Sequence, residues 1–385
     1  MHFGPLALVV AAGLVGPLLA SMHRLAPPVV IGEIIAGTVI GASGLRWIDP
    51  SDPLLAGLAS VGFALLMFIV GTRLPVRDRH LRSALLAGAG LTITVGAAAA
   101  VAGVLLAPRV GLDDPALLAV LMATSSGAVA LPILHEVGLA GRPALVATAW
   151  IAIADVATVL CLPVVLATGR VARVLLGGVL VVALGGCLYL IGRALRGREV
   201  LLRIQHLSRT RGWGLDLRVS LLALFVCAWL AARFGTSILI AGFTVGVVVA
   251  LLGEPRRVAD QLVGLGEGFA VPLFFVHLGA QLDLGALLHS AKAIELAVAL
   301  AVVAIAIHVA TAVVWRLDIG VGLLASAQLG VPAAAVSVGL ATNQLTAAQG
   351  AAVMASVLVT FGACSAGDVL LRRRRPPTSV APVAP

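Results

Sequence analysis

Apolar stretches of the length that a membrane-spanning helix needs follow one another along almost the whole chain. A helix that crosses the hydrocarbon core of a bilayer takes about 20 predominantly apolar residues. Only 11% of the 385 residues are charged, against about 25% in an average soluble domain, which excludes a solvated enzyme and a disordered chain. The sequence predicts an all-α polytopic membrane protein with thirteen transmembrane helices, at residues 5–22, 29–44, 56–72, 83–107, 114–135, 144–168, 173–193, 217–233, 236–253, 262–280, 285–314, 319–341 and 346–371.

Basic residues are distributed unevenly between the loops that join these segments. If the N-terminus lies outside, 20 of the 26 basic residues fall on the inner side. Cytoplasmic loops are enriched in Lys and Arg, so we expect a plasma (inner) membrane protein with an external N-terminus and a cytoplasmic C-terminus. The net charge of +9 then indicates orientation rather than nucleic-acid binding. No Lys or Arg precedes the apolar run at 4–22, which we interpret as the first span rather than a signal peptide.

The two halves of the chain resemble each other at a nearly constant offset. Gly-Phe-Ala occurs at 62–64 and again at 268–270, and Ala-Gly at 36–37 recurs at 241–242. An odd number of helices separates the copies, which gives them opposite topology, as in many secondary transporters; chance similarity between Gly-, Ala- and Leu-rich helices is the alternative. The predicted transporter domain spans 1–371, with repeat one at 5–168, a linker helix at 173–193, repeat two at 217–371 and a short cytoplasmic tail at 372–385.

Helix-breaking residues fall at equivalent places in the two predicted repeats. Residues 124–127 read Thr-Ser-Ser-Gly and precede Pro132, and residues 328–332 read Gln-Leu-Gly-Val-Pro. When the offset between the two repeats is added to the residue numbers of the first run, the result overlaps the second run. Interrupted helices free backbone groups that must be satisfied by protein or by a water-filled cavity. We therefore expect two discontinuous helices that cross near the middle of the membrane; two ordinary kinked helices are the alternative.

Two titratable side chains lie deep in the predicted spans. Asp155 is the only charged residue in 144–168, and an ionisable residue at such depth is a functional-site hypothesis by default. His308 lies well inside 285–314 and could carry a proton or act as a pH-dependent counter-charge. A neutral Asp155 bonded to another helix and a structural His308 are the competing interpretations.

Two further acids, Glu33 and Glu267, stand near the starts of predicted helices. An acid in the first turn of a helix is stabilised by the helix dipole. Both could cap a helix or gate a transport path.

Three motifs, ordered along the chain, resemble those of the second family of monovalent cation–proton antiporters, which share a sodium/proton-exchanger domain. They are PPVVIGEIIAG at 27–37 with GASGL at 41–45, ATSS at 123–126 with LPIL at 131–134, and GEGF at 266–269 with PLFFV at 272–276. The resemblance covers residues 5–371. It implies the sodium/proton antiporter fold, with two inverted-topology six-helix repeats, a dimerising panel, and a mobile core that gives alternating access.

The resemblance also implies where the ions bind. The family holds its cation at two adjacent polar or acidic residues on the sixth span, which correspond here to Ala154 and Asp155, so only the second acid is kept. A basic residue on the family's eleventh span has His308 as its nearest counterpart. The expected cation- and proton-binding residues are Asp155, Thr124, Ser125, Ser126 and Gln328, with Asp155 as the ligand of the monovalent cation, His308 as the coupling residue, and Glu33 and Glu267 as gating or helix-end acids.

The expected function is secondary transport rather than enzyme catalysis: an antiporter exchanging sodium or potassium for protons, with no cofactor. We expect a homodimer in the lipid bilayer. No segment is long enough for a nucleotide-binding domain, so regulation would need a separate subunit. Two alternatives stay open. An organic-anion carrier on the same scaffold is favoured by the missing ligand at Ala154, and a non-transporting membrane sensor or subunit is permitted by the absence of a regulatory domain.

Overall fold

The computed structural model describes residues 3–21, 29–72, 79–137, 139, 141–166, 171–195, 198, 207–208, 210–211, 213–236, 238–253 and 256–373. Several sequence predictions lie outside these residues. They concern Arg24, Arg73 and Arg77, which contribute to the predicted orientation, Pro27-Pro28 of the first motif, the connection at 199–206, and most of the cytoplasmic tail, at 374–385.

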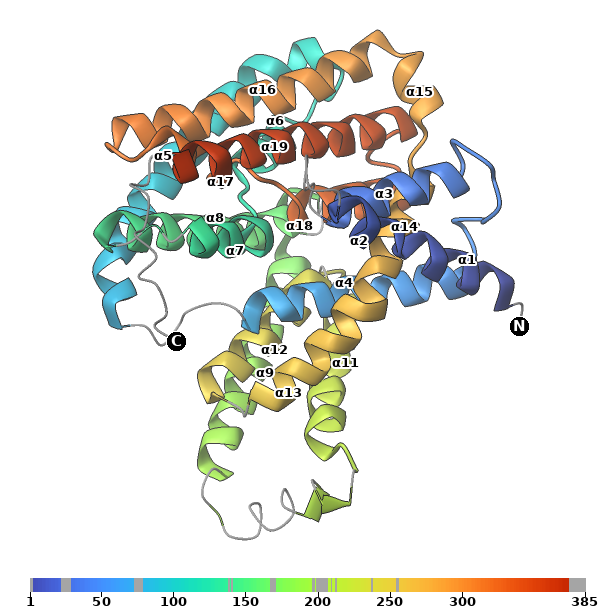
Figure 1. Ribbon diagram of the computed structural model, residues 1–385, viewed down its shortest axis with the longest axis vertical. Coiled ribbons are helices and arrows are strands. Elements are labelled where there is room, and N and C mark those ends of the chain that lie inside the picture. Colours follow the sequence, from blue (N-terminus) through green and yellow to red (C-terminus); the bar gives the residue numbers. More distant parts are fainter. Residues whose placement is uncertain are drawn as a thin grey trace, which may run out of the picture. The chain divides into compact units, whose positions relative to one another are not determined.

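Every regular element within the described part of the chain is a helix (Figure 1). By length and composition, ten helical segments there could cross a membrane, and two shorter apolar helices accompany them. An interrupted pair, α6 and α7, accounts for the remaining predicted segment. The elements are α1 (Phe3–Gly13), α2 (Val15–Ala20), α3 (Val29–Ile40), α4 (Pro53–Thr72), α5 (Arg79–Val110), α6 (Pro115–Ala123), α7 (Gly127–Val137), α8 (Gly141–Leu166), α9 (Val171–Leu195), α11 (Leu215–Phe234), α12 (Ile238–Leu252), α13 (Arg256–Leu265), η1 (Gly266–Ala270), α14 (Val271–Gln281), α15 (Leu284–Leu288), α16 (Ala291–Val314), α17 (Ile319–Ala325), α18 (Gly330–Ala341) and α19 (Ala347–Arg373).

One predicted span is wrong in its extent. The segment 285–314 was expected as a single helix, but α15 ends at Leu288 and α16 begins at Ala291. The hydroxyl of Ser290 accepts a hydrogen bond from the Ala293 amide at 3.2 Å, which is the bond that a serine makes when it caps the start of a helix. The apolar pattern does not reveal this cap because the residues on either side are equally hydrophobic.

Contacts divide the chain into two compact units, and the first takes segments from both predicted repeats. It comprises Met1–Arg79, Val156–Leu296 and Gly330–Met354. Inside it α3 packs against α14 and α12 against α4 (Figure 1). Each contact is made by two glycines four residues apart, a spacing that lets helix backbones approach closely. Gly37 of α3 and Gly41, directly after that helix, face Val276 and Ala280, and Gly242 and Gly246 of α12 face Ala64 and Phe68. Equivalent glycines thus contact a helix of the other predicted repeat, which supports the repeat.

The second unit comprises His80–Asp155, Ala297–Leu329 and Ala355–Pro385. It contains α6 and α7, which flank the first predicted interruption, and α17, which precedes the second; α18, which follows the second, belongs to the first unit. Gly88 of α5 lies against the backbone of Ala149 and Trp150 in α8, and Gly322 of α17 lies against His308 and Val309 in α16. A side chain at either glycine would meet backbone atoms within about 3 Å. These close approaches fix α8 and α16, which carry the two deeply placed titratable residues.

Candidate functional site

The first interruption lies between α6 and α7, at residues 124–126. Thr124 leaves the helix in an extended conformation, with φ −70° and ψ 146°. Thr124, Ser125 and Ser126 are all buried. Ser and Thr side chains can hydrogen-bond the nearby backbone and so compete with helix formation, which is why three of them in succession favour a break here. The predicted discontinuity is present at the expected position.

The second interruption lies between α17 and α18, at residues 326–329. Ser326 and Gln328 are buried there. Pro332 falls in the first turn of α18, where a missing amide hydrogen costs nothing, so the chain breaks before the proline rather than at it. The amide of Ser126 donates a hydrogen bond to the carbonyl of Ala327 at 2.7 Å. The two interruptions are therefore joined directly.

Asp155 is hydrogen-bonded to the residue that directly follows the first interruption. It lies within α8 and its side chain is 7% exposed. The amide of Gly127, the first residue of α7, donates to Asp155 Oδ2 at 2.9 Å, so the carboxylate meets the positive end of a helix. A Cβ at Gly127 would lie 3.1 Å from that oxygen, which explains the glycine. Asp155 and both interruptions form one connected site in the second unit.

Two polar groups in this site lack hydrogen-bond partners among the described residues: Ser125 Oγ and Gln328 Nε2. Both side chains are at most 2% exposed. Buried polar groups are normally paired with protein or ordered water. The Ser125 hydroxyl can therefore contact a transported cation or its water, and the Gln328 amide nitrogen, a donor, can bond a water molecule. That these residues bind the cation stays a prediction. The described residues contain no group of three or more His, Cys, Asp or Glu side chains placed to hold a metal ion.

His308 is fully buried in α16, in the same unit. Its Nδ1 lies 2.8 Å from the carbonyl of Ala304, so Nδ1 must donate and Nε2 carries the lone pair of a neutral ring. Nε2 has no partner within the described residues. The ring stacks on Trp150, with centroids 5.8 Å apart and planes at 20°.

Trp150 is a neighbour of the candidate residue His308 that the sequence interpretation missed. It is fully buried, and it stands five residues before Asp155 on α8. Trp150 is the single aromatic residue in the predicted span 144–168, and this was the one sequence signal that could have pointed to it. The carbonyl of Ala327 was missed as well, and no side-chain pattern could have indicated it.

Glu33 and Glu267 belong to the first unit, not to the one that carries Asp155. Glu33 is the fifth residue of α3 and only 3% exposed, and its Oε2 has no partner among the described residues. Glu267 lies in the π-helical turn η1, inside one continuous helix from α13 to α14. The prediction that Glu267 opens a helix is therefore wrong, because the helix already begins at Arg256.

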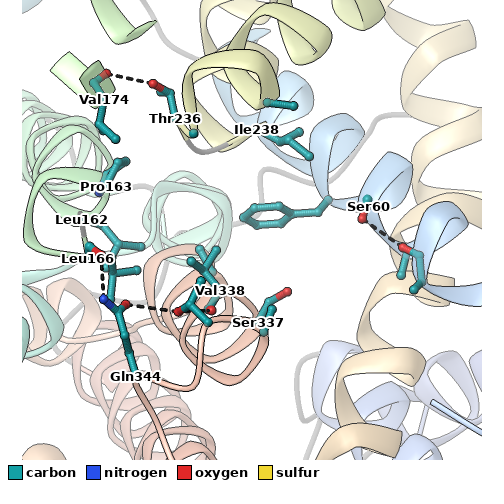
Figure 2. Close-up of a pocket in the computed structure, with 18 of the residues that line it drawn as sticks. Ser60, Leu162, Pro163, Leu166, Val174, Thr236, Ile238, Ser337, Val338 and Gln344 are labelled. Carbon is teal, nitrogen blue, oxygen red and sulfur yellow. Dashed lines mark hydrogen bonds between the residues drawn. The ribbon is translucent and has the colours of Figure 1, made fainter. Parts of the chain in front are cut away.

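A cavity of about 870 Å³ lies within the first unit, lined by parts of α4, α8, α9, α11, α12, α14 and α18. Among the hydrogen bonds drawn in Figure 2, Gln344 Nε2 donates to the Leu166 carbonyl and the Thr236 hydroxyl donates to the Val174 carbonyl, each at 2.8 Å. Leu162 and Pro163 of α8 also line the cavity. They follow Asp155 by two helical turns on that helix.

Comparisons with known proteins agree on one family. The sodium/hydrogen exchanger transmembrane family model matches residues 9–366. A putative Na⁺/H⁺ antiporter of Bacillus subtilis, YjbQ, is 27% identical over 299 residues, which cover 72% of this chain and 47% of that protein. The glutathione-regulated potassium-efflux system protein KefC of Escherichia coli is 29% identical over 270 residues, covering 68% of this chain and 42% of that protein. The chain thus spans about half the length of the curated relatives it matches.

A solved structure shares the fold. The sodium proton antiporter MjNhaP1 of Methanocaldococcus jannaschii, determined at pH 8, superposes with a TM-score of 0.65 at 15% identity, covering 96% of this chain and 98% of that one. The fold is therefore that of the sodium/proton antiporters, as the sequence predicted. Its helices make the chain a multi-pass membrane protein, and its relatives are transporters rather than enzymes. The chain belongs to the sodium/hydrogen exchanger transmembrane family of cation:proton antiporters.

Proposed function

We propose that this chain exchanges sodium or potassium for protons by alternating access, with Asp155 binding the cation and the proton in turn. The observation that carries the proposal is the connected site of the second unit. There a buried carboxylate accepts a hydrogen bond from the amide that starts α7, and the loop before that helix is bonded to the second interruption. Inward-facing ionisable residues beside broken helices are typical of ion pathways.

The ligands for a dehydrated cation would come from both interruptions. Asp155 supplies the negative charge, and the hydroxyls of Thr124, Ser125 and Ser126 and freed backbone carbonyls supply neutral oxygens, as carbonyl oxygens do in ion-selective pores. Gln328 would complete the set. Ala154 contributes no side-chain ligand, so Asp155 carries the full charge of the exchange.

The stoichiometry follows from which groups release a proton. If Asp155 alone exchanges one proton for one monovalent cation, the cycle moves no net charge. If His308 also releases a proton through Nε2, each cycle carries net charge across the membrane.

The division into two units supports a mobile core, because one unit carries the whole site around Asp155. We further propose that the other unit is the dimerising panel of a homodimer. The proposed location is a plasma membrane, with the N-terminus outside and the C-terminus in the cytoplasm. The proposed role is pH homeostasis, under the control of a separate regulatory subunit.

The test of antiport uses everted membrane vesicles that hold a pH gradient reported by a fluorescent amine. Sodium, potassium and lithium are added in turn. The proposal predicts that at least one of them collapses the gradient in vesicles with the protein, and not in vesicles without it. No response to any of the three cations would overturn the antiporter proposal and leave the non-transporting alternative.

Removing a neutral ligand should weaken cation binding without abolishing it. For Ser125→Ala and Gln328→Leu we expect the cation concentration at half-maximal response to rise about fivefold, because a lost polar contact costs about 1 kcal/mol. The measurement is the cation dependence of gradient collapse. Ser365→Ala is the matched control, since the hydroxyl of Ser365 is bonded to the Phe361 carbonyl of its own helix. Unchanged affinity in both site variants would remove these residues from the ligand set.

The Trp150–His308 pair should shape the pH dependence of transport. A protonated His308 adds positive charge to the second unit and opposes cation binding, so wild-type activity should fall as pH decreases below the range in which a histidine is neutral. His308→Gln removes that charge, and we expect a flatter acidic limb in the pH profile. The charged and titratable residues of the facing helix α8 are Arg142, Asp155 and Cys161, and α17 contains none between Ile319 and Ala325.

Variants of Trp150 test whether this residue positions the His308 ring or only fills space in the core. Trp150→Phe keeps an aromatic face for stacking, whereas Trp150→Leu removes it. Trp150→Leu should displace the acidic limb in the wild-type background and leave it unchanged in the His308→Gln background. If wild type and His308→Gln have identical pH profiles of transport, Trp150 and His308 serve only in core packing.

A further inference from the structure

The cavity in the first unit carries an unexpected charge for a protein that moves cations. Its described lining includes Arg173, Arg233 and His277 and contains no Asp or Glu. A cleft lined by one sign of charge raises the local concentration of ions of the opposite sign. From the charge of its described lining we infer that this cavity attracts anions rather than cations.

One of its lining side chains is a buried donor that has no acceptor among the residues that the structure describes. His277 is 6% exposed, and its Nε2 lies 3.0 Å from Gln281 Nε2. An amide nitrogen can only donate, so His277 Nε2 accepts this bond and Nδ1 carries the proton. Nδ1 has no partner among the described residues. A buried N–H group is costly to leave without an acceptor, and an anion in the cavity would supply one.

The arginines have donors to spare. Arg173 Nη2 donates to the carbonyl of Arg233 at 2.9 Å, which ties one guanidinium to the backbone beside the other. A guanidinium has five N–H donors, so the others remain available for a carboxylate. Charge-assisted bonds of this kind are among the stronger hydrogen bonds in proteins.

The rest of the wall combines apolar side chains, which indicate the kind of anion, with the polar residues Ser60, Thr236, Gln281, Ser337, Thr342 and Gln344. Phe63, Leu162, Leu166, Ile238, Phe274 and Val338 all line the cavity. Its volume of about 870 Å³ lies within the range of small-molecule sites, about 300–1,000 Å³. A halide or a phosphate would leave these side chains uncovered. An organic anion with an apolar body would cover them while its carboxylate meets the arginines and His277.

We propose that this cavity is a binding site for a small monocarboxylate with an apolar body. The same chemistry could arrive from two sources, a carboxylate dissolved in water or a fatty acid from the bilayer. The lining of this cavity lies in the first unit and includes none of the residues proposed to bind the cation. It also gives the organic-anion alternative a defined place.

Binding to the purified full-length protein in detergent tests the site without any transport, so its failure is distinct from a failure of antiport. Benzoate is the soluble probe and benzamide its uncharged match. Decanoate is the lipid-like probe and decanol its uncharged match. Affinities are measured by calorimetry and by the ligand-dependent rise in unfolding temperature. We expect benzoate or decanoate to bind at least tenfold more tightly than its uncharged match.

Variants identify the cavity as the place of binding. Arg173→Gln combined with Arg233→Gln should weaken carboxylate binding tenfold or more, as should His277→Leu, while His277→Gln keeps a donor and should restore part of the affinity. Arg109→Gln is the matched control, since Arg109 is also exposed and does not line the cavity. Size-exclusion profiles confirm that each variant is folded.

The two probes separate the sources. Binding of decanoate without benzoate would assign the carboxylate to the bilayer, and binding of benzoate would assign it to the aqueous phase; either outcome supports the site. Equal affinity for charged and uncharged probes, or carboxylate affinity that survives all the arginine and histidine variants, would overturn the proposal.

Discussion

Asp155→Asn should abolish cation-dependent proton movement. The amide has nearly the shape of the carboxyl group, but it carries no charge to hold a cation and no acidic proton to exchange. Losing the charged partner of a buried ion costs about 3 kcal/mol or more, which corresponds to about a 100-fold loss of cation affinity. We expect the gradient-collapse signal to fall to that of vesicles without the protein, at every pH tested and for each cation.

Asp114→Asn is the matched control for this result. Asp114 caps α6, where its side chain accepts hydrogen bonds from Ala116 and Leu117, and asparagine caps a helix about as well as aspartate. This variant makes the same chemical change on a helix that leads into the site, and it should keep nearly full activity. Antiport that persists in Asp155→Asn at wild-type cation concentrations would remove Asp155 from the mechanism.

Gly242→Leu should destabilise the first unit severely. A Cβ at this position would overlap the carbonyl of Ala64 on α4. Backbone cannot move aside as a side chain can, so the cost should reach the upper end of over-packing, about 3 kcal/mol. That corresponds to a fall in unfolding temperature of roughly 6–12 °C for a domain of 150–250 residues. The measurement is thermal unfolding of the purified protein, together with the yield of folded material.

Gly37→Leu and Gly57→Leu complete this test. Gly37 is the predicted repeat equivalent of Gly242 and meets the Val276 carbonyl in the same way, so the two variants should lose similar stability. Gly57 has no atom within 4 Å of an added Cβ and should tolerate leucine. An unfolding temperature of Gly242→Leu that is no lower than that of Gly57→Leu would contradict the close contact between α12 and α4. It would also remove the support that this contact gives to the predicted repeat.

Much of the fold could be predicted from sequence because each span needs its own run of apolar residues. The interruption at Thr124–Ser126 could be predicted because three hydroxyl side chains in a row disfavour a helix in an apolar segment. Asp155 stood out because a carboxylate in 144–168 has no neighbouring charge. These signals are local, and each can be read within one helix.

Features that depend on contacts between helices could not be predicted in the same way. The Trp150–His308 stack joins residues far apart in the chain, and the Ser126–Ala327 bond uses only backbone atoms. The π-helical turn that holds Glu267 lies in an unbroken helix and leaves no hydrophobic signature. Arg173 and Arg233 are 60 residues apart in the chain, and only the folded backbone brings both to one cavity.

Proton release on cation binding tests the central claim most directly, because one carboxylate cannot hold both ions. Purified protein in weakly buffered detergent solution is titrated with sodium or potassium, and released protons are counted against bound cations. Wild type should release a proton from Asp155 for each cation bound at a pH where that carboxyl is protonated, and Asp155→Asn should release none and bind no cation. Cation binding without proton release, or the same release from Asp155→Asn, would contradict exchange at Asp155.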